Sequence, residues 1–181
     1  MKNFKLLCII IACANIFAAC KKDKTNVEPA DQLPLATQTG ANTFGCLVNG
    51  ELFINKGADG NNSNYRLTVD PNFQNGSLQI RVYSLQNNKY KKININSNNI
   101  NSVGTYNVFG NGGPLFIDFI NENTQCSFNQ NINCYLNGRL IVTRYDIFNG
   151  IFSGSFEFKL KDPSYNCDTI RITEGRFDKK L

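Results

Sequence analysis

The sequence predicts an all-β protein: a single antiparallel β-sandwich or flattened barrel of about ten strands. Two observations support this prediction. Apolar and polar residues alternate with a period of two along several segments, and Asn-Gly pairs stand between apolar runs. The alternation gives each strand one apolar and one polar face, which is typical of antiparallel sheets. No segment has the apolar spacing of a helix of useful length.

Five segments carry the alternation most clearly, and each of them predicts a strand. The residues that we expect to face the core are Tyr65, Leu67 and Val69; Leu78, Ile80 and Val82; Ile93 and Ile95; Phe156, Phe158 and Leu160; and Ile170 and Ile172. Most of the residues between them are polar or charged, so the opposite faces of these strands are expected to meet solvent.

Asn-Gly pairs predict tight turns, because both central residues of a type I′ turn need a positive φ. Such pairs occur at 49–50, 75–76, 111–112, 137–138 and 149–150. Three of these pairs are flanked by clear apolar runs, and they predict hairpins centred on 49–50, 137–138 and 149–150.

The start of the chain predicts an export signal with a lipidation site. An apolar run at residues 6–17 follows two lysines, and the small pair Ala18-Ala19 precedes Cys20. The run is shorter than the roughly 20 residues that a membrane-spanning helix needs. The order resembles a bacterial lipoprotein signal, in which the cysteine receives fatty acyl chains such as palmitate. Cys13 fits the same pattern, but cleavage there would leave apolar residues after it, so we favour lipidation of Cys20.

We expect three parts: a signal peptide at 1–19, a lipidated cysteine and flexible linker at 20–42, and a β domain at 43–181. The linker prediction rests on polar and charged residues without periodicity. The expected location is the bacterial envelope, with a lipid anchor in the outer membrane. The formal net charge of +5 is spread along the chain and does not predict nucleic-acid binding.

Four cysteines follow the lipidation site, and in an oxidising compartment they predict two disulfides. These cysteines are Cys46, Cys126, Cys134 and Cys167. Four cysteines allow three pairings, of which we favour Cys126–Cys134 with Cys46–Cys167. The competing zinc site lacks both a C-x-x-C pair and any histidine. The absence of histidine also excludes Ser-His-Asp and Cys-His catalysis.

One loop carries a calcium hypothesis. Asp59, Asn61, Ser63 and Asp70 have the spacing of oxygen ligands in a calcium-binding loop. Asn64, however, stands where such loops have glycine, and no helices are expected on either side. An ordinary asparagine-rich hairpin loop is the alternative. Calcium is the one cofactor that the sequence suggests.

Carboxylates and aromatic residues supply the other candidates. A glycoside hydrolase needs two carboxylates about 5–10 Å apart, and the available acids are Asp118, Glu122, Asp146, Glu157 and Glu174. Four aromatic residues are candidates for the face opposite the core, where they could stack on a sugar or contact a partner: Tyr83, Tyr106, Phe116 and Tyr145. The alternative, which we favour, is that both faces of these strands are partly buried. Arg176 and Asp178 are expected to form a structural ion pair.

Both ends of the β region resemble a family of uncharacterised lipoproteins of the Bacteroidota type. The resemblance rests on CLVNGELF at 46–53, GSFEF at 154–158 and TEGRFD at 173–178. It implies a shared fold and lipoprotein status, and it carries over no functional residue.

Together these features favour a non-catalytic, envelope-anchored domain that binds a glycan or another small ligand. The alternatives are a structural or assembly partner of another envelope protein and a carboxylate-based hydrolase. The discriminating features are a polar cleft for the binder, a flat apolar patch for the partner, and two acids in one pocket for the hydrolase.

Overall fold

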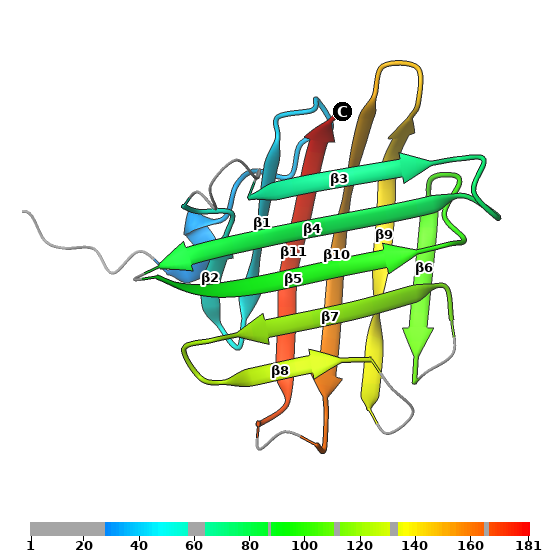
Figure 1. The fold of residues 1–181 in the computed structure, drawn as a ribbon. Helices are drawn as coiled ribbons and strands as arrows, with labels where there is room; N and C mark the ends of the chain where they lie inside the picture. The colour runs from blue at the N-terminus through cyan, green and yellow to red at the C-terminus, as the bar shows by residue number, and fades with distance from the viewer. Residues whose placement is uncertain (1–27, 58–63, 87, 111–112, 131–133, 165–166) are drawn as a thin grey trace, which may run out of the picture.

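The computed structural model describes residues 28–57, 64–86, 88–110, 113–130, 134–164 and 167–181. These residues form eleven strands and one short 3-10 helix, and the strands build two antiparallel sheets that pack face to face (Figure 1). The predicted all-β sandwich is therefore confirmed, and the sheets do not close into a barrel. Among the residues described, no helix is long and apolar enough to cross a membrane.

The six-stranded sheet has the order β2-β1-β11-β10-β9-β6, and the five-stranded sheet has the order β3-β4-β5-β7-β8. The first sheet contains β2 (Glu51–Ile54), β1 (Thr43–Val48), β11 (Ile170–Lys180), β10 (Ile151–Lys161), β9 (Tyr135–Asp146) and β6 (Gly104–Phe109). The second contains β3 (Tyr65–Asp70), β4 (Ser77–Gln86), β5 (Lys89–Ser97), β7 (Leu115–Asn121) and β8 (Cys126–Asn129). The helix η2 (Pro29–Gln32) precedes both sheets. Strands of one sheet cross those of the other, so the packing is crossed rather than aligned (Figure 1).

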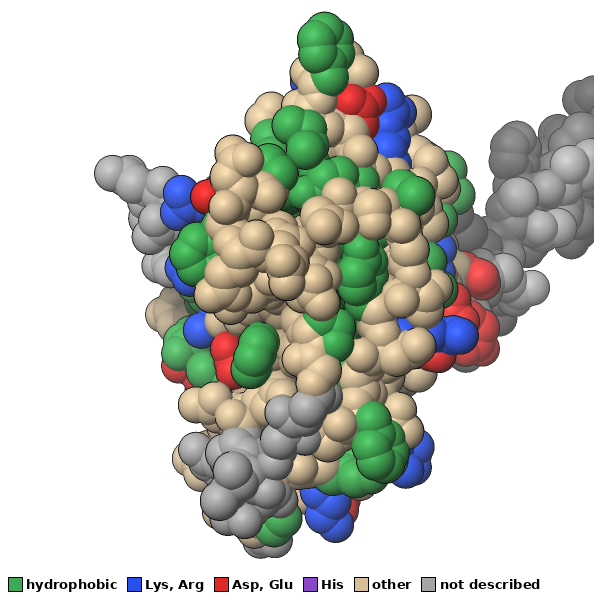
Figure 2. Space-filling view, turned by 90° about the vertical axis from the view of Figure 1, so that its right-hand side faces the viewer, with side chains coloured by type: hydrophobic (Ala, Val, Ile, Leu, Met, Phe, Trp, Pro, Cys, Tyr) green, Lys and Arg blue, Asp and Glu red, His purple; other side chains and the backbone are tan. Residues whose placement is uncertain are grey.

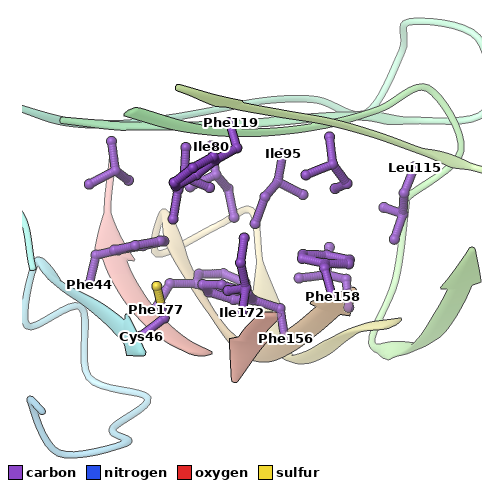
Figure 3. Packing of buried hydrophobic residues seen from close by; sticks show 14 of the residues in the cluster. Phe44, Cys46, Ile80, Ile95, Leu115, Phe119, Phe156, Phe158, Ile172 and Phe177 are labelled. Carbon is purple, nitrogen blue, oxygen red and sulfur yellow. The ribbon is translucent and has the colours of Figure 1, made fainter. Parts of the chain in front are cut away.

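The core lies between the two sheets and is built from their inward-facing side chains. Phe44, Phe156, Phe158, Ile172 and Phe177 of the six-stranded sheet point toward residues of the other sheet (Figure 3). Those partners include Ile80, Ile95, Leu115 and Phe119. The rings of Phe44 and Phe156 stack with centroids 5.3 Å apart. All residues predicted to face the core are buried except Val69, which is half-buried and packs against the core.

The Asn-Gly pairs behave as predicted at two of the three hairpins. Asn49 and Gly50 connect β1 to β2 with φ of 52° and 82°, as a type I′ turn requires. The pair at 149–150 lies in the turn between β9 and β10. The pair at 75–76 precedes β4, whereas 111–112 lies outside the described residues.

The hairpin predicted at 137–138 is wrong, because Asn137 and Gly138 lie inside β9. A Cβ atom at Gly138 would collide with the backbone of β10 at Glu157 and Phe158. The glycine is therefore required for close approach of two strands and not for a turn.

The flexible linker predicted for 20–42 is wrong for its C-terminal part, because residues 33–42 pack on the six-stranded sheet. We call residues 33–42 the strap. Leu33 is buried, and a Cβ atom at Gly45 of β1 would lie 2.6 Å from the Pro34 ring. The folded unit thus begins before the predicted boundary at 43.

A buried carboxylate holds the strap in place. Asp178 of β11 is 1% exposed. From the strap, its oxygens accept hydrogen bonds from the Thr37 hydroxyl at 2.6 Å and from the backbone amides of Thr39, Gly40 and Ala41 at 3.0, 2.8 and 3.1 Å. The Ser153 hydroxyl of β10 donates a further hydrogen bond at 2.7 Å. Although burial raises the pKa of Asp178, the hydrogen bonds from these donors outweigh it and hold the pKa well below its usual value.

The predicted Arg176–Asp178 ion pair is wrong, since Arg176 pairs with Glu174.

The predicted disulfide pairing is also wrong. Cys126 pairs with Cys167, with Cα atoms 5.7 Å apart, and links β8 of one sheet to the segment that precedes β11 of the other. Cys46 points into the core, where burial raises the pKa of its thiol (Figure 3). The Cys134 thiol donates a hydrogen bond to the Asn129 carbonyl at 3.4 Å. The register pairs Val48 with Ile172, so Cys167 lies beyond the end of β1 and out of reach of Cys46.

We expect Asp178→Asn to lower the free energy of unfolding by about 3 kcal/mol, because an amide cannot accept from all of these donors. The pKa of Asp178 is lower in the folded protein, so its stabilising contribution is complete above the unfolded value of about 4 and is lost as the pH falls below it. Urea unfolding between pH 7 and pH 2 measures how the free energy of unfolding of each protein depends on pH. Wild-type stability should decline at acidic pH, and the variant should decline less. Equal slopes of the free energy of unfolding against pH in the two proteins would contradict the proposed role of Asp178.

Peptide mapping without reduction should recover Cys126 and Cys167 in one cross-linked peptide pair. Replacing both with serine should lower the free energy of unfolding by about 3–4 kcal/mol, because the disulfide closes a long loop with a sequence separation of 41. Cys134→Ser serves as the control for the loss of a cysteine. Recovery of a Cys126–Cys134 or Cys46–Cys167 link would overturn the assignment.

Candidate functional site

A hollow of about 340 Å³ opens on the outer face of the six-stranded sheet. Strands β9, β10 and β11 supply most of its lining, and Ala36 of the strap completes it. We call it the Arg–Glu hollow, because its charged residues are Arg139, Glu157, Glu174 and Arg176. Its other lining residues are Ile141, Ser155, Phe156 and Gly175.

Two ion pairs fix the charged groups of the hollow. Arg139 and Glu157 face each other across β9 and β10, and the Arg139 Nε atom lies 2.9 Å from Glu157 Oε1. On β11 an Arg176 Nη atom lies 3.2 Å from Glu174 Oε2. The other Arg176 Nη atom donates to the Pro34 carbonyl of the strap at 3.3 Å. The strap therefore helps to orient one of the two arginines.

A β-bulge in β11 forms part of the hollow. The pairing with β10 jumps from Phe156–Gly175 to Phe158–Ile172, which leaves an extra residue in β11. Glu174 has φ of 54°, a left-handed conformation that is costly for a non-glycine residue. Bulges re-aim side chains, and this one brings the Glu174 side chain to the hollow. Gly175 is needed beside it, because a Cβ atom there would lie 2.5 Å from the Phe156 ring.

A second hollow of about 230 Å³ adjoins the first on the same face, and Glu157 lines both of them. We call it the Lys–Arg hollow, after Lys159 and Arg171. Asn137 and Thr173 supply its uncharged polar side chains.

Two exposed aromatic rings lie farther along the same face. Phe109 and Tyr135 are 73% and 41% exposed, and their rings meet edge to face with centroids 6.5 Å apart. Lys159 Nζ lies 5.7 Å from the Tyr135 ring centroid. Asn137 pairs with both Phe109 and Lys159 in the strand register, so these side chains share one face of the sheet. The aromatic pair was missed at the sequence level, because each ring stands at the end of a strand without a flanking alternation.

The predicted acids separate into different environments. Of the five, the Arg–Glu hollow brings together Glu157 and Glu174. Asp146 is the last residue of β9, and hydrogen bonds from Arg144 and Asn149 lower its pKa to about 2. Asp118 lies in β7 of the five-stranded sheet, and Glu122 directly follows that strand, where its carboxylate accepts a hydrogen bond from the Tyr90 amide at 2.8 Å.

The predicted outward aromatic face is only partly present. Phe116 is exposed, and Tyr83 is half-buried beside Tyr90. Tyr106 and Tyr145 are partly buried and pack against the core, in agreement with the alternative that both faces of these strands are partly buried. Burial raises the pKa of Tyr145, whose ring meets Phe152 edge to face at 5.1 Å. The irregular pairing between Ser153 and Gly154 displaces the register beside Tyr145, which a strict alternation does not anticipate.

The calcium hypothesis loses one of its four ligands. Tyr65–Asp70 is an extended strand, so Asp70 lies about 17 Å beyond its start. An Asp70 oxygen accepts instead from the Asn72 amide at 2.9 Å. Asp59, Asn61 and Ser63 lie outside the described residues. Within the parts of the chain that the structure describes, no group of three or more His, Cys, Asp or Glu residues could hold a metal ion.

The arrangement is suited to hydrogen bonding with a polar ligand. Arginine presents a planar fork of donors and glutamate presents acceptors, and the rigid sheet fixes both. Comparisons with protein-family models, curated proteins and solved structures find no match to this chain.

Proposed function

We propose that the protein is a lipid-anchored, non-catalytic domain of the bacterial envelope that binds a hydroxyl-rich ligand, such as a glycan, in the Arg–Glu hollow. The observation that carries the proposal is the paired arrangement of Arg139–Glu157 and Arg176–Glu174 in one hollow on a rigid sheet. Neighbouring sugar hydroxyls both donate and accept hydrogen bonds, and this hollow offers both kinds of partner.

The site is organised before a ligand arrives. Cross-strand pairing places Glu157 opposite Arg139, and the bulge places Glu174 beside Arg176. Strap contacts with Asp178 and Arg176 hold the remaining side of the hollow. Such preorganisation reduces the entropy lost on binding, which matters for a ligand that buries little apolar surface.

Binding is favoured over hydrolysis by the partners of the two acids. A glycoside hydrolase needs one carboxyl group that carries a proton and donates it to the leaving oxygen. Glu157 and Glu174 each form an ion pair with an arginine, so one oxygen of each carboxylate is already engaged within the protein. Both side chains are also more than half exposed, without the apolar pocket that keeps a catalytic acid protonated.

The anchor part of the proposal rests on the sequence signal at Cys20. Only residues 21–27 separate Cys20 from the described chain, and eight Cα–Cα steps reach at most about 30 Å. An acylated Cys20 would therefore keep the start of the described chain within about 30 Å of the membrane surface. A flexible linker extending to residue 42 would allow a larger separation.

One observation favours assembly with an envelope protein as a second candidate. Strand β6 is an open edge of the six-stranded sheet, and its six residues include neither a charge nor a proline. Proteins commonly protect edges with such residues. Figure 2 shows this side of the molecule, where uncharged polar side chains and backbone dominate the surface. An extended segment of a partner could add to this edge.

Cys20→Ser should abolish incorporation of radiolabelled palmitate and release the protein from sedimenting membranes, because it removes the only thiol at the predicted cleavage site. Cys13→Ser should change neither result. Unchanged labelling of the Cys20→Ser variant would contradict the anchor.

A glycan array probed with the purified protein should give binding that Arg139→Gln and Glu174→Gln each weaken at least tenfold, since each removes one half of a fixed pair. Arg66→Gln on the exposed face of β3 is the matched control and should bind normally. Silence across the array would contradict the binding proposal. Release of shorter sugars, abolished by Glu157→Gln, would replace it with hydrolysis.

A further inference from the structure

We infer that the outer face of β9, β10 and β11 forms one elongated site for a linear acidic oligosaccharide. The site would extend from the Arg–Glu hollow through the Lys–Arg hollow to the aromatic pair of Phe109 and Tyr135. This inference rests on the proposed binding function of the Arg–Glu hollow and names the ligand class.

Strand register makes the three parts continuous. Arg139 pairs with Glu157, and two residues along the same strands Asn137 pairs with Lys159. Phe109 of β6 pairs with Asn137, which brings the aromatic pair beside the Lys–Arg hollow. From Arg139 to Tyr135 the strand advances about 13 Å. The face is therefore longer than one sugar ring and suits several rings in a row.

The charges of this face point to an acidic ligand. The carboxylates of Glu157 and Glu174 are matched by Arg139 and Arg176. The ion pairs of the described residues include neither Lys159 nor Arg171, both of which are exposed. Two positive charges at the Lys–Arg hollow thus remain available to carboxylates of a ligand. Asn137 and Thr173 beside them offer hydrogen bonds to hydroxyl groups.

The aromatic pair suits the end of such a chain. Phe109 and Tyr135 expose large ring surfaces next to Lys159, and their edge-to-face contact fixes both orientations. An aromatic ring can pack against the apolar face of a sugar, while a neighbouring lysine binds its carboxylate. Linear uronic-acid polymers combine these two features, whereas a neutral glycan leaves the two cations without partners.

Isothermal titration of the full-length protein in detergent micelles with hexagalacturonate and hexamannuronate tests the inference, with methyl-esterified hexagalacturonate as the neutral counterpart. At least one acidic hexamer should bind ten times more tightly than the neutral one. Its affinity should fall as salt rises from 50 to 300 mM, because the added contacts are ionic.

Lys159→Gln and Arg171→Gln should each weaken binding of the acidic hexamer about tenfold and reduce the difference in affinity between the acidic and the neutral hexamer. Tyr135→Ala should weaken binding of both hexamers, and Arg66→Gln should weaken neither. Circular dichroism and melting temperature check that the variants remain folded. Equal affinity for acidic and neutral hexamers would overturn the inference while leaving the proposed function standing. Absence of acidic binding would overturn the inference alone if array ligands still bind in an Arg139-dependent manner, and both proposals if none does.

Discussion

The hydrogen bonds to Asp178 are the interaction on which the outer face of the sheet depends. A buried carboxylate is costly unless donors surround it, and here the donors come mainly from a segment far away in the sequence. The strap is thereby fixed across β11 and β1, and from this position it supplies Ala36 to the Arg–Glu hollow and a carbonyl to Arg176. One carboxylate thus connects the closure of the fold to the geometry of the candidate site.

The sandwich itself followed from local rules, and those rules predicted it well. Alternation identified the inward faces, because a residue in a half-buried strand faces either core or solvent. Turns were predicted correctly where the turn conformation requires a positive φ, as at Asn49-Gly50. The same dipeptide failed at Asn137-Gly138, where glycine is required by the neighbouring backbone of β10. Such a tertiary contact leaves no local signal.

The site could be predicted only in part, because it depends on pairing between distant strands. Glu157 and Glu174 were recognised as candidate acids, but neither their shared hollow nor their arginine partners could be derived without the order of β9, β10 and β11. The strap resembled a linker because it forms no strand: three of its backbone amides and the Thr37 hydroxyl donate to Asp178 instead. Likewise, Cys126 meets Cys167 because β8 and the start of β11 lie at the same end of the sandwich, which cysteine spacing cannot show.

The most direct test of the account is a map of amide chemical shifts in the protein while an oligosaccharide from the array is added. The account predicts that the largest changes fall on Arg139, Glu157, Glu174 and the strap beside them, and that the outer face of the five-stranded sheet stays unchanged. Changes concentrated on β3, β4 and β5, or along the β6 edge alone, would contradict it.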